Sequence, residues 1–371
     1  MVLKKVLLLF VVICGSLALP FFFVSAQEKT ADDTTFKGIV LEVTEQQLRT
    51  LPDGAQVEQQ NLRLKGLEGE FKDRVVNYYG IGDVDVIKKN IYQQGDKVLV
   101  VASSDDQGQV TYYVTDYVRT GSLLFLSIIF LLSLVAVGGW KGVRSVMSLT
   151  LSFVVIMKYI VPQIIGGADP ITVTVIGSFV ILMLIIYMTE GFNKLSHLSV
   201  VSIFISLLIT VALSWLFVDL ARLSGLASEE SSFLIGVGTG AINFQGLLMA
   251  GIIIGALGVL DDIVISQVAT AMEIHKTDSH LSRTEIFKRT YSVGISHISS
   301  MTNTLFLAYA GASLSLLVLF GSGQSGFVGW GQALNNELIA TEIVRTMAGS
   351  VGLVLSVPVS TFLAAWWVKR A

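Results

Sequence analysis

Two adjacent carboxylates, Asp261 and Asp262, interrupt an apolar segment that is long enough to cross a membrane, residues 246–273. Carboxylates inside such a segment are costly unless they face water, an ion or a partner. Neighbouring carboxylates at low dielectric also resist joint ionisation, so one of them would hold a proton or share a cation. The pair predicts a proton or cation site. The alternative is that it marks the cytoplasmic end of a shorter span and is simply solvated.

The rest of this segment supports a polar face. At helical spacing Asp262, Ser266 and Glu273 fall on one stripe, with Asp261 about a third of a turn away. Gln267 stands next to this stripe. A polar stripe on an otherwise apolar helix is expected to point into a helical bundle rather than at lipid.

A second polar group occupies one end of the apolar segment 294–320. Its members are Ser296, His297, Ser299, Ser300, Thr302, Asn303 and Thr304. His297 titrates near neutrality and could relay protons or ligate a metal, although an intramembrane histidine is also often a hydrogen-bonded packing residue. Because a short loop joins the two segments, we expect Ser300, Asn303 and His297 to lie beside the acidic pair at the cytoplasmic face.

Other residues in apolar segments suggest structural roles. Glu342 and Arg345 are three apart and can pair on one helix, with a gate or substrate contact as the alternative. Lys158, midway through residues 145–165, needs a carboxylate partner or water. Gly251, Gly255 and Gly258 form a small-residue seam that is typical of close helix packing.

Enzyme motifs are missing from the sequence. It contains no HExxH, GxSxG or GxxxxGK[ST] pattern. Two aspartates on one helix diverge by about 100°, unlike a protease dyad on two helices. We therefore expect no cofactor and favour a non-enzymatic function, and the metal content is left open.

Composition places the chain in a membrane. Of its 371 residues, 53% are hydrophobic and 14% charged, whereas about 25% of residues are charged in soluble domains. The net charge of −3 argues against nucleic acid as a partner. The only cysteine is Cys14, so an intrachain disulfide is impossible.

Seven apolar spans follow residue 120. They are residues 121–140, 145–165, 170–189, 197–220, 245–272, 294–320 and 338–368. Residues 231–244 are apolar but short and glycine-rich, and could form a re-entrant piece. The basic residues between spans gather on one side, which predicts an extracytoplasmic segment 27–119 and a cytoplasmic C-terminus.

The N-terminal third of the sequence has a different pattern from the apolar spans. Residues 1–26 are a signal peptide or an N-terminal membrane anchor, with both left open. In residues 27–119, alternating apolar residues such as Ile39, Leu41 and Val43 predict about five strands with a core, and a short helix near 84–90. This pattern suits a small exported β-barrel of the OB type. Residues 120–371 then form a transmembrane helical domain.

Two long motifs, GIIIGALGVLDDIVISQVATAMEI at 251–274 and GISHISSMTNTLFLAYAGASLSLLVLF at 294–320, resemble the YibE/F family of bacterial multi-pass membrane proteins. Shorter matches are GGWKG at 138–142 and EGFN at 190–193. The exported domain resembles a YibE-type member. The resemblance implies a plasma-membrane location and a YibF-type companion, with a homo-oligomer as the alternative. It implies little about activity.

These observations lead to two hypotheses. The first is transport of a small solute or ion, coupled to protons through Asp261, Asp262 and His297. The second is a scaffold or envelope assembly factor that docks partners through its exported domain. A membrane enzyme comes third. Transport predicts a water-accessible cavity that reaches the acidic pair, whereas a scaffold predicts a sealed bundle and an apolar patch on residues 27–119.

Overall fold

A computed structural model describes residues 33–50, 56–81, 91–104, 108–236, 242–322 and 329–368. The chain divides into two compact units, residues 1–133 and 134–371. The predicted N-terminal segment 1–26 and the predicted helix at 84–90 lie outside the described residues.

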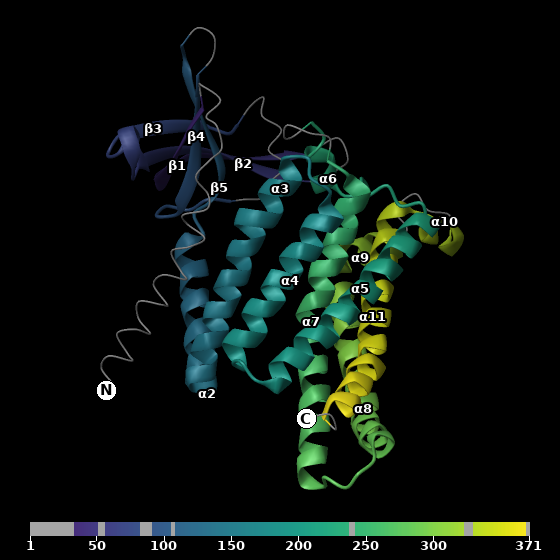
Figure 1. The fold of residues 1–371 in the computed structure, drawn as a ribbon. Coiled ribbons are helices and arrows are strands. Elements are labelled where there is room, and N and C mark those ends of the chain that lie inside the picture. Colours follow the sequence, from purple (N-terminus) through teal and green to yellow (C-terminus); the bar gives the residue numbers. More distant parts are fainter. Residues whose placement is uncertain are drawn as a thin grey trace, which may run out of the picture. The chain divides into compact units, whose positions relative to one another are not determined.

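The first unit contains one antiparallel sheet in the order β3-β2-β1-β4-β5 (Figure 1). Its strands are β1 (Asp33–Thr50), β2 (Gln56–Gly66), β3 (Val75–Tyr79), β4 (Lys97–Ser104) and β5 (Val110–Tyr117), with a 3-10 turn at Gly69–Phe71. The edge strands β3 and β5 contact each other, so the sheet curves into a half-barrel. Five strands agree with the sequence pattern.

The core of the half-barrel corrects one prediction. Phe36 and Val40 of β1 are 2% and 1% exposed, whereas Ile39 and Leu41 are only half-buried. The β1–β2 register shifts between Val40 and Glu42, so Leu41 is an extra residue in a β-bulge. A bulge reverses the inward face of a strand, which is why a single alternation was wrong for Ile39 and Leu41, whereas Val43, beyond the bulge, packs against the core.

Helices make up the rest of the chain. They are α2 (Thr120–Val155), α3 (Val161–Ile165), α4 (Pro170–Thr189), α5 (Lys194–Leu220), α6 (Glu229–Phe233), α7 (Phe244–Thr277), α8 (Arg283–Ala312), α9 (Leu314–Gly321), α10 (Trp330–Leu334) and α11 (Glu337–Val368). A π-helical turn, Ile156–Ile160, joins α2 to α3.

Local sequence explains where these helices begin. Asp169 caps α4 by accepting a hydrogen bond from Thr172 N at 2.9 Å, and proline follows at the first helical position. Asn243 caps α7 in the same way. Ser282 and Glu285 form a reciprocal capping box at the start of α8.

Five helical segments of the described chain are long and apolar enough to cross a membrane, or six if α8 and α9, bent by 66°, count as one. The predicted spans 121–140 and 145–165 fall in one segment of 46 residues, Thr120–Ile165. Its helix is interrupted at Gly139, whose φ of 54° and ψ of −130° are not helical. The prediction of seven spans is therefore confirmed only in part.

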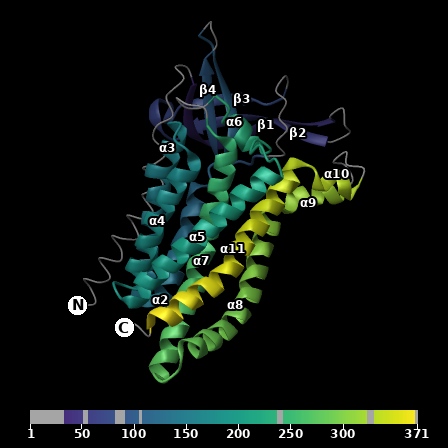
Figure 2. The same cartoon turned by 45° about the vertical axis from the view of Figure 1, so that its right-hand side comes forward.

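Within the second unit α7 packs against α4, α5, α8 and α11. α11 packs against α5, α7 and α8 (Figures 1 and 2). Contacts between small residues bring these helices close: a side chain at Gly352 of α11 would collide with Thr210 of α5. The same holds for Gly294 of α8, which packs against Val357.

Candidate functional site

The two predicted polar segments meet where α7 packs against α8. The hydroxyl of Ser266 lies 3.5 Å from Nδ1 of His297. His297 is half-buried and faces α7. The structure therefore brings together one residue from each predicted polar group, Ser266 and His297.

The acidic pair lies one turn away along α7. Asp261 is half-buried and its Oδ1 accepts a hydrogen bond from the backbone N–H of Asp262 at 2.9 Å, while the Asp262 side chain is exposed. Within the described chain no hydrogen bond or ion pair joins either aspartate to His297. The pair and the histidine share a neighbourhood without direct contact.

A hydrogen bond between α7 and α11 shows how deep the acidic pair lies within the helical unit. Thr361 Oγ1 donates to Gln267 Oε1 at 3.1 Å, and both helices run from the end carrying α6 and α10 to the opposite end (Figure 2). Asp261 and Asp262 precede Gln267 by six and five residues, which places them level with Leu355 and Ser356. That level is about 5 Å from the midpoint of α11. The pair thus lies near mid-depth of the helical unit and not at an end of α7.

The other predicted polar residues separate from this contact. Ser300 and Asn303 lie on the exposed face of α8. Glu273 pairs with Lys276 at 3.5 Å, and their side chains are 70% and 78% exposed, so this carboxylate has the surroundings of a solvated helix end. The residues predicted to form one cluster therefore lie at separate places on α7 and α8.

A cavity of about 480 Å³ follows the polar stripe of α7 toward its C-terminal end. Its lining residues are Ser266, Ala269, Thr270, Glu273, Ile274, Thr277, Asp278 and Arg289. Ser266 thus belongs both to this cavity and to the contact with His297. The cavity therefore stops one helical turn short of Asp262, and neither aspartate lines it.

A layer of fully buried polar residues lies next to this site. The sequence carries only a weak signal for it. Gln267 and Thr361 are each 0% exposed, and no partner in the described chain satisfies Nε2 of Gln267. On α5 the residues at spacing four are also fully buried: Ser202, Ser206, Thr210 and Ser214. That spacing was the available signal, but serine within an apolar helix also occurs as a simple packing residue.

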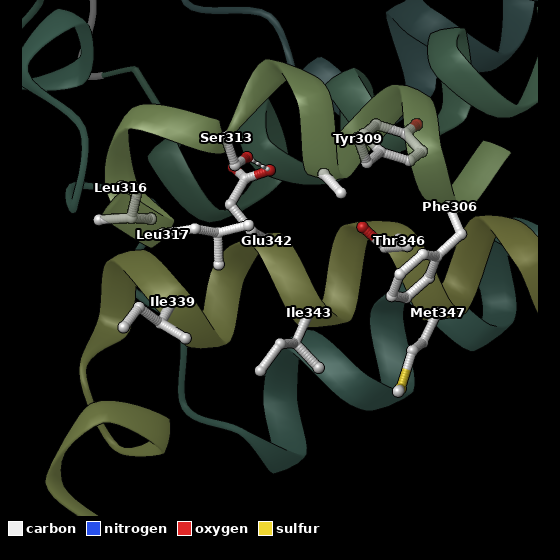
Figure 3. A pocket seen from close by; sticks show the side chains of 11 residues that line it. Phe306, Tyr309, Ser313, Leu316, Leu317, Ile339, Glu342, Ile343, Thr346 and Met347 are labelled. Carbon is white, nitrogen blue, oxygen red and sulfur yellow. Dashed lines mark hydrogen bonds between the residues drawn. The ribbon is translucent and has the colours of Figure 1, made fainter. Parts of the chain in front are cut away.

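The second polar site lies toward the opposite end of the bundle and contains the ion pair predicted between Glu342 and Arg345. Glu342 accepts from Arg345 Nη1 at 2.8 Å and from Ser313 Oγ at 3.0 Å. Figure 3 shows Glu342 and Ser313 beside a cavity of about 140 Å³ whose other labelled side chains are mostly apolar, Phe306 and Met347 among them.

The three glycines of α7 have different surroundings. A Cβ on Gly255 would lie 2.6 Å from the Tyr309 hydroxyl, so this position packs closely against α8. Apart from the chain neighbours and the backbone of α7 itself, no atom of the described chain lies within 4 Å of a Cβ placed on Gly251 or Gly258. Close packing inside this chain therefore accounts for Gly255 and not for the other two.

The remaining sites can be placed briefly. Lys158 lies on the π-helical turn, with an exposed side chain. No group of three or more His, Cys, Asp or Glu residues in the described part of the chain is arranged to hold a metal ion.

The profile of YibE/F-like proteins matches residues 126–370, and the chain belongs to this family. The match covers the helices that carry both polar sites. No curated protein matches the chain, and no solved structure does.

Proposed function

We propose that this protein is a membrane transporter for a small solute or ion, with a proton or cation site at Asp261 and Asp262. The cavity that ends at Ser266 is the observation that carries this proposal, because it brings open space to within a turn of two mid-depth carboxylates. Carboxylates at such depth are characteristic of ion and proton pathways. Ser266 and His297 would connect the pair to this cavity.

Reconstituted protein tests this function. Liposomes on a solid-supported electrode are exposed to jumps of amino acids, organic acids, sugars and inorganic cations. We expect a transport current for at least one class, lost in Asp262→Asn and retained in Asp219→Asn. Asp219 is a suitable control because it is exposed at the end of α5. Absence of current from folded wild-type protein with every class would contradict transport.

We also propose seven membrane spans, with the break at Gly139 dividing Thr120–Ile165. A straight helix of 46 residues would be about 69 Å long, twice what a bilayer needs. The strand domain is proposed to be OB-like and extracytoplasmic in a bacterial plasma membrane. In a Cys14→Ser background, Gly108→Cys should be labelled from outside intact cells and His280→Cys should not. The reverse pattern would overturn this orientation.

A scaffold function is the second candidate. The outward face of edge strand β3 exposes two large apolar side chains, Val75 at 48% and Tyr79 at 69%, which suits docking of an envelope partner. A YibF-type companion and a second copy of this chain are both proposed occupants. Loss of a co-purifying partner in Tyr79→Ser, with transport currents absent from wild type, would favour this alternative.

A further inference from the structure

A separate cavity of about 290 Å³ lies next to the Glu342–Arg345 pair. Its wall comes from the segment around α6, the start of α7 and the start of α11, and its polar members are Ser228, Glu230, Ser231, Thr341, Glu342 and Arg345. Glu342 lines both this cavity and the apolar cavity of Figure 3.

Two donors in this wall lack acceptors. The hydroxyl of Thr341 and Nε of Arg345 are buried, and neither has a hydrogen-bond partner in the described chain. Arg345 uses Nη1 for Glu342. Buried donors without acceptors are rare because each costs free energy. An arginine Nε and a hydroxyl together suit a carboxylate ligand.

The charged residues that line the cavity indicate which second group the ligand carries. Glu342 is already held by Arg345 and Ser313. Glu230 lines the same cavity, is exposed, and forms no ion pair among the described residues. The charge of Arg345 is already paired with Glu342, so the cavity offers one available carboxylate, Glu230, beside two neutralised or neutral donors, Arg345 Nε and the Thr341 hydroxyl. A carboxylate and free donors in one cavity favour a ligand that carries both signs of charge over a simple anion.

We propose that this cavity binds a small zwitterion with a carboxylate and an ammonium group, the chemistry of a free amino acid. Arg345 and Thr341 would hold the carboxylate, and Glu230 the ammonium group. The claim that such a zwitterion is the transported substrate rests on the proposed transport function. The claim that it binds does not rest on that function, and binding can be measured in detergent whether or not anything is transported.

Two glycines provide a matched pair of variants. Gly251 lines this cavity and Gly258, two turns further along α7, lines none of the cavities described here. Both have open space where an added Cβ would lie. Gly251→Leu should therefore fill the cavity without a clash, and Gly258→Leu should leave it open. Both changes also raise helix propensity, so folding should survive in each.

The experiment measures binding of radiolabelled leucine to purified protein, with its amine analogue (isoamylamine) and its acid analogue (isocaproate) as competitors. We expect leucine to bind, both analogues to compete at least roughly tenfold more weakly, and Thr341→Val to weaken leucine binding by roughly tenfold. Gly251→Leu should abolish binding and Gly258→Leu should not.

Three results would overturn the proposal. They are no binding of leucine by folded wild-type protein, competition by isocaproate equal to that by leucine, and unchanged binding in Gly251→Leu. Leucine binding without any transport current would support the site and contradict the transport function, so the two failures are distinguishable.

Discussion

Ser266 Oγ and His297 Nδ1 face each other at 3.5 Å across the α7–α8 contact. This relationship joins two polar groups that are 31 residues apart, and Ser266 also lines the inner end of the 480 Å³ cavity, one helical turn from Asp262.

Replacing Asp262 with asparagine should leave the protein folded while transport is lost. The exposed Asp262 side chain makes no ion pair in the described chain, and its removal relieves repulsion with Asp261. We expect thermal stability in detergent to hold or rise, with a change within about 0.5 kcal/mol. A loss of about 3–5 kcal/mol would instead identify Asp262 as half of a buried ion pair.

The Gln267–Thr361 hydrogen bond should contribute to stability. Thr361→Val removes the donor to a fully buried amide oxygen, at an expected cost of about 1–3 kcal/mol. Adding Gln267→Leu should recover part of that cost, which a double-mutant cycle measures. Ser360→Ala is the control, since Ser360 bonds to the carbonyl of Val357 in its own helix. Additive effects of the two changes would show that they are uncoupled.

Glycine should be specifically required at position 139 for the stability of the protein. Its φ of 54° and ψ of −130° disfavour any residue with a Cβ, so Gly139→Ala should destabilise the protein by about 1–3 kcal/mol. Gly138→Ala is the matched control, because Gly138 lacks a positive φ and has open space around it. Equal melting temperatures for the two variants would refute a conformational role of Gly139.

The strand domain should lose stability in alkali. Burial raises the pKa of Tyr78 above its usual value of 10.0. The unfolded chain therefore ionises first, so this stability is fully present below about pH 10 and is lost as pH rises through the folded pKa. Chemical denaturation of residues 27–119 should show this decline, and Tyr78→Phe should reduce it. An unchanged slope in Tyr78→Phe would contradict the assignment.

Much of the helical unit was predictable because hydropathy and caps act locally. The span 170–189 was placed correctly because Asp169 and Pro170 determine its start. The residues of β1 that face the core were not placed correctly, because the bulge at Leu41 depends on pairing with β2. The polar groups of α7 and α8 were visible as residues, but their separation into half-buried His297 and exposed Asn303 depends on how α8 rotates against its neighbours. The cavity beside Thr341 was not predictable, since its wall comes from three distant segments.

Water access to the acidic pair is the most direct test of the proposed transport site. In a Cys14→Ser background, the single-cysteine variants Asp262→Cys and Ser266→Cys are treated with a charged, membrane-impermeant thiol reagent. Leu208→Cys serves as the control, because Leu208 lies mid-way along α5 and is 44% exposed on an apolar face. Our account predicts that the reagent modifies the Asp262→Cys and Ser266→Cys variants and leaves the Leu208→Cys variant unmodified. If the first two variants are as unreactive as the control, the bundle is sealed and the transport site is refuted.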